Sequence, residues 1–287
     1  MVAPPPVPPV VTGAPEPPDP VAALSAGTVA CWYLDTARVA GSADAVAGWL
    51  ADDDRQRADR FATAALRRQF IAQRVWLAAV LSRYANVPPG AVRIVRDDRG
   101  KPRLAGDAPV AFGLTHGGDH CIVAVRPNAP VGIDAEALAP VADGPALARR
   151  FFAPEEAAAL ARRPAAIRDR AFLSVWTRKE AVLKALGLGL GGALDGFAVT
   201  AWPDPPRLLG SRLPALDPAA WALFDAEPAA GCLACLATPV PVRAVRWRTL
   251  AGTGPVAAPA LADGALPWTD LDPAPVRSAG GLGAGVL

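Results

Sequence analysis

The chain has 287 residues, of which 52% are hydrophobic and 20% charged, and this composition suits one large or two modest folded domains. Its formal net charge is only +2, which argues against a nucleic-acid partner held by bulk charge. Four cysteines do not indicate a disulfide scaffold, and no run of 18 apolar residues is present to cross a bilayer. We therefore expect a cytoplasmic protein without a membrane partner.

The two ends of the chain differ in composition from the part between them. Residues 1–27 carry nine prolines within the first twenty positions, which predicts a disordered tail. Residues 251–287 are rich in Gly, Ala and Pro and poor in charge, which predicts a flexible tail. We assign residues 28–127 to an N-terminal half and residues 128–250 to a C-terminal half.

The N-terminal half is expected to begin with an apolar strand and to continue through helical segments into one long amphipathic helix. Its last two strands are joined by a short Gly-Gly-Asp connection, which is typical of a hairpin. The expected strands and long helix are, in chain order, TVACWYL (28–34), the helix at 66–84, VRIV (92–95), AFGLTH (111–116) and HCIVAV (120–125).

The C-terminal half repeats this order of elements. We expect the strand VGIDAE (131–136), a helix at 145–152, a second helix from Pro154, a long helix at 167–186, and strands at 197–202, 221–226, 232–237 and 242–247. The repeat predicts an α+β fold of two similar halves related by a pseudo-two-fold, with the active site in the cleft between them.

Two carboxylates stand at the end of the apolar run VGI. Asp134 and Glu136 are two residues apart, so in a strand they point to the same face, about 6–7 Å apart. Such a pair repels unless a cation lies between, and hard oxygen ligands suit Mg²⁺. The alternative is a strand that runs out into solvent, where paired acids are harmless.

The long helix at 167–186 carries three further candidates. Lys179 falls inside the apolar stripe of this helix, where an unpaired ammonium is costly. Glu180 and Lys184 lie one turn apart on its flank. The alternatives are an ordinary i,i+4 pair for Glu180 and Lys184 and a Lys179 that extends along the helix surface.

Lysine is rare in this chain, since only three of its 29 basic residues are Lys, namely Lys101, Lys179 and Lys184. In an otherwise Arg-rich chain this weakly indicates that a compact ammonium is needed at these positions. Lys101 lies in the turn-like RGKP, where a solvated side chain is the alternative. Thr115 and His116 end a strand, where they can contact phosphate or belong to a surface turn.

Cys232 and Cys235 form a C-x-x-C pattern that invites a redox or zinc interpretation. Two residues three apart in a strand face opposite sides of it, and no second C-x-x-C completes a zinc site. We therefore expect buried structural cysteines. An unrelated Mg²⁺–nucleotide enzyme is a further alternative, but the chain has no P-loop or G-x-G-x-x-G after a strand.

Taken together, three motifs resemble those of the 4′-phosphopantetheinyl transferase family in its longer, surfactin-synthetase-activating type. They are VGIDAE (131–136), RFFAPEE (150–156) and FLSVWTRKEAVLKALGLGL (172–190), the last of which matches W-x-x-K-E-x-x-x-K. RGKP (99–102) and GLTHG (113–117) match the family more loosely. The resemblance covers roughly residues 28–250. It implies Mg²⁺-dependent transfer of the phosphopantetheine arm of coenzyme A to a serine of an apo acyl or peptidyl carrier protein, releasing adenosine 3′,5′-bisphosphate.

The resemblance also implies roles for the candidate residues. Asp134, Glu136 and Glu180 would hold Mg²⁺ against the pyrophosphate, and Lys184 would neutralise the phosphate under attack. Glu180, directly or through a metal-bound water, would take the proton of the serine. The residues expected at coenzyme A are Thr115 and His116 at its phosphates, Lys101 at its adenylate end, Lys179 as a brace or near the 3′-phosphate, and Arg57, Arg68 or Arg74 at the 3′-phosphate.

The sequence departs from the family pattern at Gly113, where members often carry Asn, and at Thr115, where they often carry Ser. Thr keeps the hydroxyl, but Gly113 offers no polar side chain. The main alternative function is a non-catalytic, carrier-binding protein of the same fold. A monomer is expected, because both halves of the site come from one chain.

Overall fold

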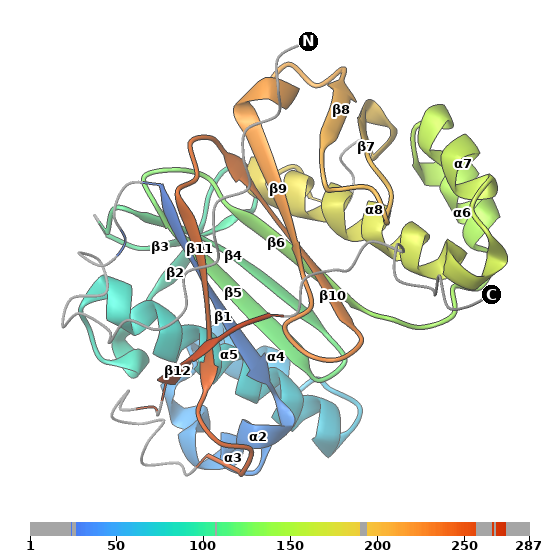
Figure 1. The fold of residues 1–287 in the computed structure, drawn as a ribbon. Helices are drawn as coiled ribbons and strands as arrows, with labels where there is room; N and C mark the ends of the chain where they lie inside the picture. The colour runs from blue at the N-terminus through green and yellow to red at the C-terminus, as the bar shows by residue number, and fades with distance from the viewer. Residues whose placement is uncertain are drawn as a thin grey trace. The chain divides into compact units, whose positions relative to one another are not determined.

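The computed structural model describes residues 24, 27–106, 108–189, 194–256, 266 and 268–273. The chain forms two compact units, which are drawn in Figure 1. Unit 1 comprises Met1–Pro130 and Pro241–Asp272, and unit 2 comprises Val131–Val240 and Pro273–Leu287. The predicted tail at 1–27 lies, apart from Leu24 and Gly27, outside the described residues.

Unit 1 contains a five-stranded sheet of order β12-β11-β1-β5-β4, in which β11 runs parallel to β1 and the other neighbours are antiparallel. A separate hairpin pairs β2 with β3. The α-helices and strands of unit 1 are β1 (Thr28–Asp35), α2 (Ala37–Ala40), α3 (Ala43–Val46), α4 (Asp52–Ala58), α5 (Ala64–Ala85), β2 (Ile94–Arg96), β3 (Pro102–Leu104), β4 (Val110–Gly117), β5 (His120–Pro127), β11 (Ala244–Leu250) and β12 (Trp268–Leu271).

Unit 2 contains a three-stranded antiparallel sheet of order β6-β10-β9 and a hairpin of β7 with β8. Helix α8 packs against β6 and β10 of that sheet (Figure 1). The α-helices and strands of unit 2 are β6 (Gly132–Ala137), α6 (Gly144–Phe151), α7 (Pro154–Ala161), α8 (Ala165–Leu186), β7 (Phe197–Val199), β8 (Leu208–Ser211), β9 (Trp221–Ala226) and β10 (Cys232–Pro239).

The predicted repeat of elements is confirmed within each unit. Both units begin with a strand, continue through short helices into a helix of 22 residues, and then form a small hairpin followed by two longer strands. In both, the first strand pairs with the last of these and the order is the same, β1-β5-β4 and β6-β10-β9. The α+β class is therefore confirmed, while the pseudo-two-fold and the cleft stay predictions.

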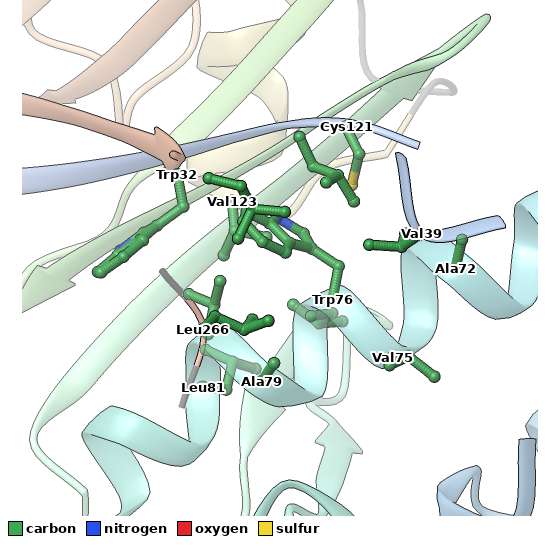
Figure 2. Packing of buried hydrophobic residues seen from close by; sticks show 14 of the residues in the cluster. Trp32, Val39, Ala72, Val75, Trp76, Ala79, Leu81, Cys121, Val123 and Leu266 are labelled. Atoms are coloured by element: carbon green, nitrogen blue, oxygen red, sulfur yellow. The ribbon is translucent and has the colours of Figure 1, made fainter. Parts of the chain in front are cut away.

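The core of unit 1 lies between α5 and one face of its sheet, as Figure 2 shows. Trp32 of β1 and Trp76 of α5 are almost fully buried there. Phe112, Val123 and Val125 of β4 and β5 belong to the same cluster. None of the helices in the described ranges is both long and apolar enough to cross a membrane.

The sequence prediction for residues 242–271 is wrong in two respects. The strand expected at 242–247 in the C-terminal half is β11, which pairs with β1 in unit 1. Residues 268–271, assigned to a flexible tail, form β12 beside β11. Arg38 holds the intervening chain by donating to the carbonyls of Leu250 and Ala251 at 2.8 Å each. Residues 257–265, 267 and 274–287 of the predicted tail lie outside the described residues.

Trp268→Ala is expected to destabilise unit 1 measurably. The Trp268 ring lies 4.5 Å from the Trp32 ring and 5.0 Å from the Trp76 ring, centroid to centroid. Because Trp268 is only partly buried, we expect a loss of about 2 kcal/mol, below the ~3–5 kcal/mol of a fully buried Trp. Urea unfolding checks this value, and an unchanged midpoint would show that β12 adds nothing to stability.

Candidate active site

The first residue of β6 lies directly against α8. A β carbon on Gly132 would stand 2.0 Å from the Ala181 carbonyl oxygen and 2.4 Å from the Ala185 amide nitrogen. Both atoms are backbone, so only glycine lets the helix approach this closely. The approach brings the β6 acids, Asp134 and Glu136, close to Glu180 and Lys184 of α8.

Gly132→Ala is expected to move α8 away from β6. Overpacking a close-packed core costs about 1–3 kcal/mol, and we expect the upper end because helix backbone cannot rotate aside as a side chain can. Thermal unfolding measures the loss. Gly189→Ala is a poor control, since Gly189 has a positive φ, whereas Gly210→Ala meets nothing within 4 Å and should leave the midpoint nearly unchanged.

Asp134 and Lys184 form an ion pair in unit 2. The Lys184 Nζ lies 2.6 Å from Asp134 Oδ1, and the side chains are 33% and 7% exposed respectively. The ammonium therefore sits at the edge of the acid cluster with part of its surface open to solvent. From this position the Lys184 ammonium can bind an anionic ligand while it stays close to the carboxylates.

Glu180 and Glu136 are the other two acids of the cluster. Burial, followed by the nearby charge of Asp134, raises the pKa of Glu180 to about 7, although Lys184 opposes the shift. Burial and Asp134 also raise the pKa of Glu136, against Lys184 and a hydrogen bond with Trp176. Glu180 Oε1 is buried and has no hydrogen-bond partner among the described residues. The fold thus holds three mutually repelling carboxylates together with one ammonium.

The donor set suits Mg²⁺. Carboxylate oxygens are the hard ligands that Mg²⁺ takes, and a divalent ion would satisfy Glu180 Oε1 and offset the repulsion among the three acids. Across the described ranges, no three His, Cys, Asp or Glu side chains already enclose a metal position. The residue types of the cluster therefore fit Mg²⁺, and the carboxylates would move into the ligand geometry when the ion binds.

Lys179 lies apart from this cluster, and its surroundings argue against the predicted contact with coenzyme A. Its side chain is 0% exposed and pairs with Glu156 Oε2 at 2.8 Å. Its ammonium also donates to the carbonyls of Leu194, at 2.7 Å, and Phe197. A lysine has three N–H donors, so all are used inside unit 2. The bracing role is the one the geometry supports.

The coenzyme A candidates on strands and loops belong to unit 1. Thr115 and His116 are neighbours on β4, where alternation sends their side chains to opposite faces of the sheet. Thr115 is buried and His116 is exposed, so the two side chains do not meet one phosphate from one face. Lys101 is partly buried, and burial lowers its pKa to about 8 despite Asp97.

The arginine candidates lie on α4 and α5. Arg57 is exposed, and its guanidinium carbon lies 5.3 Å from the centroid of the Phe70 ring. Arg74 is partly buried and pairs with Asp54 at 2.6 Å. Arg68 is exposed. An arginine already paired with a carboxylate has fewer donors left for phosphate, so Arg57 and Arg68 are the better-placed candidates.

Sequence analysis missed the roles of three residues that place α8 within unit 2: Gly132, Glu156 and Arg178. Glu156 entered the sequence analysis only as the last residue of the motif RFFAPEE (150–156). Its neighbour on α8, Lys179, gave the only signal, because a lysine in an apolar stripe must find a partner. Arg178 is fully buried and pairs with Asp225 of β9 at 2.5 Å, and no feature of the sequence indicated this.

The cysteine pattern does not form a site. Cys232 and Cys235 are free and buried, and burial raises the pKa of the Cys232 thiol to about 12. Burial likewise raises the pKa of the Cys235 thiol. Thiols held protonated are poor nucleophiles and metal ligands, which supports the prediction of structural cysteines.

Two family models match the chain. Residues 130–232 match the model of the 4′-phosphopantetheinyl transferase superfamily, and residues 42–128 match that of the 4′-phosphopantetheinyl transferase, N-terminal, family. The chain is 32% identical to 4′-phosphopantetheinyl transferase HetI of Nostoc sp. over 229 residues, which span 79% of this chain and 93% of HetI.

Two relatives from bacilli are similar over a shorter part. The 4′-phosphopantetheinyl transferase psf-1 of Bacillus pumilus is 29% identical over 188 residues, covering 65% of this chain and 78% of psf-1. The 4′-phosphopantetheinyl transferase ffp of Bacillus subtilis is 26% identical over 173 residues, covering 60% and 75%. The matched models and relatives thus carry one and the same activity in their names.

Proposed function

The chain belongs to the 4′-phosphopantetheinyl transferase superfamily, whose activity is the transfer of phosphopantetheine to carrier proteins, and we propose that it does so with coenzyme A as donor and Mg²⁺ as cofactor. The acceptor is a serine of an apo acyl or peptidyl carrier protein. The other product is adenosine 3′,5′-bisphosphate. The protein acts in this proposal as a cytoplasmic monomer.

The observation that carries the proposal is the cluster of Asp134, Glu136, Glu180 and Lys184. Burial, followed by the charge of Asp134, raises the pKa of both Glu136 and Glu180, and the ammonium of Lys184 lies at the solvent-exposed edge of the cluster. Phosphoryl transfer depends on charge neutralisation and positioning more than on covalent help from the protein. A bound Mg²⁺ would supply the first by drawing charge from the pyrophosphate oxygens.

The residues of the cluster divide the remaining work. The serine oxygen attacks the phosphorus that bears pantetheine, and the bond from that phosphorus to the bridging oxygen of the pyrophosphate breaks. The electron pair leaves with adenosine 3′,5′-bisphosphate. Lys184 binds the phosphoryl oxygens, and Glu180, whose pKa is raised to about 7, accepts the proton of the serine hydroxyl directly or through a bound water.

The side chains of unit 1 are proposed to bind coenzyme A. His116 is exposed and can contact a phosphate, while Arg57 offers a guanidinium that Phe70 supports from one side. Lys101 carries the adenylate contact implied by its RGKP motif. Thr115 is buried, so in this proposal its side chain stabilises β4, the strand that carries His116, and does not contact coenzyme A.

The test is to incubate the protein with coenzyme A, Mg²⁺ and several apo carrier proteins, and to weigh the carriers by mass spectrometry. We expect the mass of the carrier to rise by that of one phosphopantetheine arm. No such rise should occur when EDTA is present in the reaction. Carriers that bind the protein but gain no mass, with coenzyme A bound, would favour the non-catalytic alternative. Neither gain nor coenzyme A binding would overturn the proposal.

A further inference from the structure

Three consecutive charged residues of α8 are buried. Arg178, Lys179 and Glu180 are 0%, 0% and 4% exposed. Successive residues on an α-helix are rotated by about 100°, so the three side chains leave the helix in three directions. Of the three, Glu180 lies one helical turn before Lys184, whose Nζ is 2.6 Å from Asp134 Oδ1 of β6.

The first two residues are bonded to fixed parts of unit 2. Arg178 pairs with Asp225 of β9 at 2.5 Å and donates to the Asp204 carbonyl at 3.0 Å. Lys179 pairs with Glu156 of α7 and donates to the carbonyl of Leu194. These contacts hold α8 from two sides at the turn that carries Glu180.

Glu156 is the hub of the second set of contacts. Its Oε1 accepts from the Val199 amide at 2.7 Å, and its Oε2 accepts from the Ala153 amide at 2.8 Å as well as from Lys179. The carboxylate therefore joins the start of α7, the end of β7 and the middle of α8. It is 3% exposed, so it does not meet solvent or a ligand.

Stability alone does not account for such a pair. Replacing a buried ion pair by apolar residues of similar volume is often neutral or stabilising. What the pair does supply is a fixed orientation of α8. Both ions have all their hydrogen-bonding groups engaged, so neither side chain can rotate. Glu180 has no such restraint of its own, since its Oε1 lacks a hydrogen-bond partner among the described residues. The direction of its carboxylate comes from the rotation of the helix.

We propose that Glu156 and Lys179 are positioning residues for Glu180. Their ion pair fixes the rotation of α8 about its axis and so keeps the Glu180 carboxylate beside Asp134 and Glu136, ready to share a divalent cation. The inference rests on the proposed metal site and function. Neither Glu156 nor Lys179 touches the substrate.

The test is the double variant Glu156→Gln/Lys179→Met, which removes both charges and keeps similar side-chain volumes. We expect a folded protein whose unfolding midpoint is below that of the wild type but above that of Lys179→Met alone, because no unpaired charge stays buried while the carbonyls of Leu194 and Phe197 still lose their donor. Titration with Mn²⁺ in the absence of coenzyme A, followed by electron paramagnetic resonance, should show affinity lowered about 10–100-fold, as for other residues that support metal ligands. Half-maximal transfer should then need correspondingly more Mg²⁺.

The matched control is Arg170→Met/Glu227→Gln. This pair, at 3.0 Å, also involves α8, but Arg170 lies ten residues before Glu180, about 15 Å along the helix. Its loss should leave Mn²⁺ affinity unchanged. Should the first double variant fail to fold, Glu156→Asp keeps the charge and withdraws the carboxylate by one methylene, and it should weaken Mn²⁺ binding in the same direction.

Unchanged Mn²⁺ affinity in the folded double variant, or in Glu156→Asp, overturns the inference. An equal loss in the Arg170/Glu227 control also overturns it, because the effect would then belong to any ion pair that involves α8. A wild-type protein that binds Mn²⁺ but modifies no carrier contradicts the proposed function instead, and the Mn²⁺ comparison still decides the positioning role.

Discussion

Glu180→Gln is expected to lower kcat for phosphopantetheine transfer by about 10²–10⁴-fold, the usual contribution of a positioned proton acceptor. The amide has nearly the shape of the carboxylate but cannot accept the serine proton and is a weaker ligand for Mg²⁺. The KM for coenzyme A should change much less, because the proposed contacts of Arg57 and His116 are untouched. Steady-state kinetics on a carrier that the wild-type protein modifies gives both constants.

Stability separates this loss from a folding defect. Glu180 Oε1 is buried without a hydrogen-bond partner in the described ranges, so a neutral amide should not lower the unfolding midpoint of the metal-free protein. The control is Glu155→Gln, since Glu155 is exposed in the first turn of α7 and its loss should leave kcat unchanged. A Glu180→Gln protein with wild-type kcat would remove Glu180 from the mechanism.

Lys179→Met is expected to have the largest effect on stability. The substitution keeps the side chain's length but leaves the Glu156 carboxylate buried without its cation, a defect that costs about 3–5 kcal/mol. Two backbone carbonyls, those of Leu194 and Phe197, also lose their donor. Urea unfolding followed by circular dichroism measures the loss.

Lys184→Met is the contrast within the same helix. Lys184 is 33% exposed and pairs with Asp134, which is 7% exposed, so we expect a loss of stability between the ~1 kcal/mol of an exposed ion pair and the ~3–5 kcal/mol of a fully buried one. Its transfer activity should nevertheless fall sharply, because the charge on the attacked phosphate goes uncompensated. Equal losses of stability in the two variants would contradict the separation into brace and site.

The sequence was sufficient for the long helix and most of the longer strands of each half, but not for the short strands β3 and β8 or for β12. A long segment with apolar residues at helical spacing is compatible with an α-helix alone. The helix expected at 66–84 is accordingly α5 (Ala64–Ala85), and the helix expected at 167–186 is α8 (Ala165–Leu186). The strand VGIDAE and the motif on α8 were also sufficient to nominate Asp134, Glu136, Glu180 and Lys184. These predictions depend on spacing along one element, which the chain itself records.

Tertiary contacts decided what spacing does not record. The partner of Lys179 lies on another helix, and an apolar stripe reveals only that a buried ammonium needs a partner. The strand β11 pairs with β1 across more than two hundred residues of sequence, and β12 forms because Trp268 finds the rings of Trp32 and Trp76.

Gly132 shows the same division within a single motif. As a letter in VGIDAE it marked a family resemblance, and the sequence offered no physical reason for it. The structure supplies the reason, since a β carbon there would overlap the backbone of α8. The sequence by itself therefore determined the two long helices and nominated the residues of the acid cluster. Which side chains serve the site and which serve the packing was decided by the close approach of elements distant in the chain, because burial and pairing depend on neighbours in space.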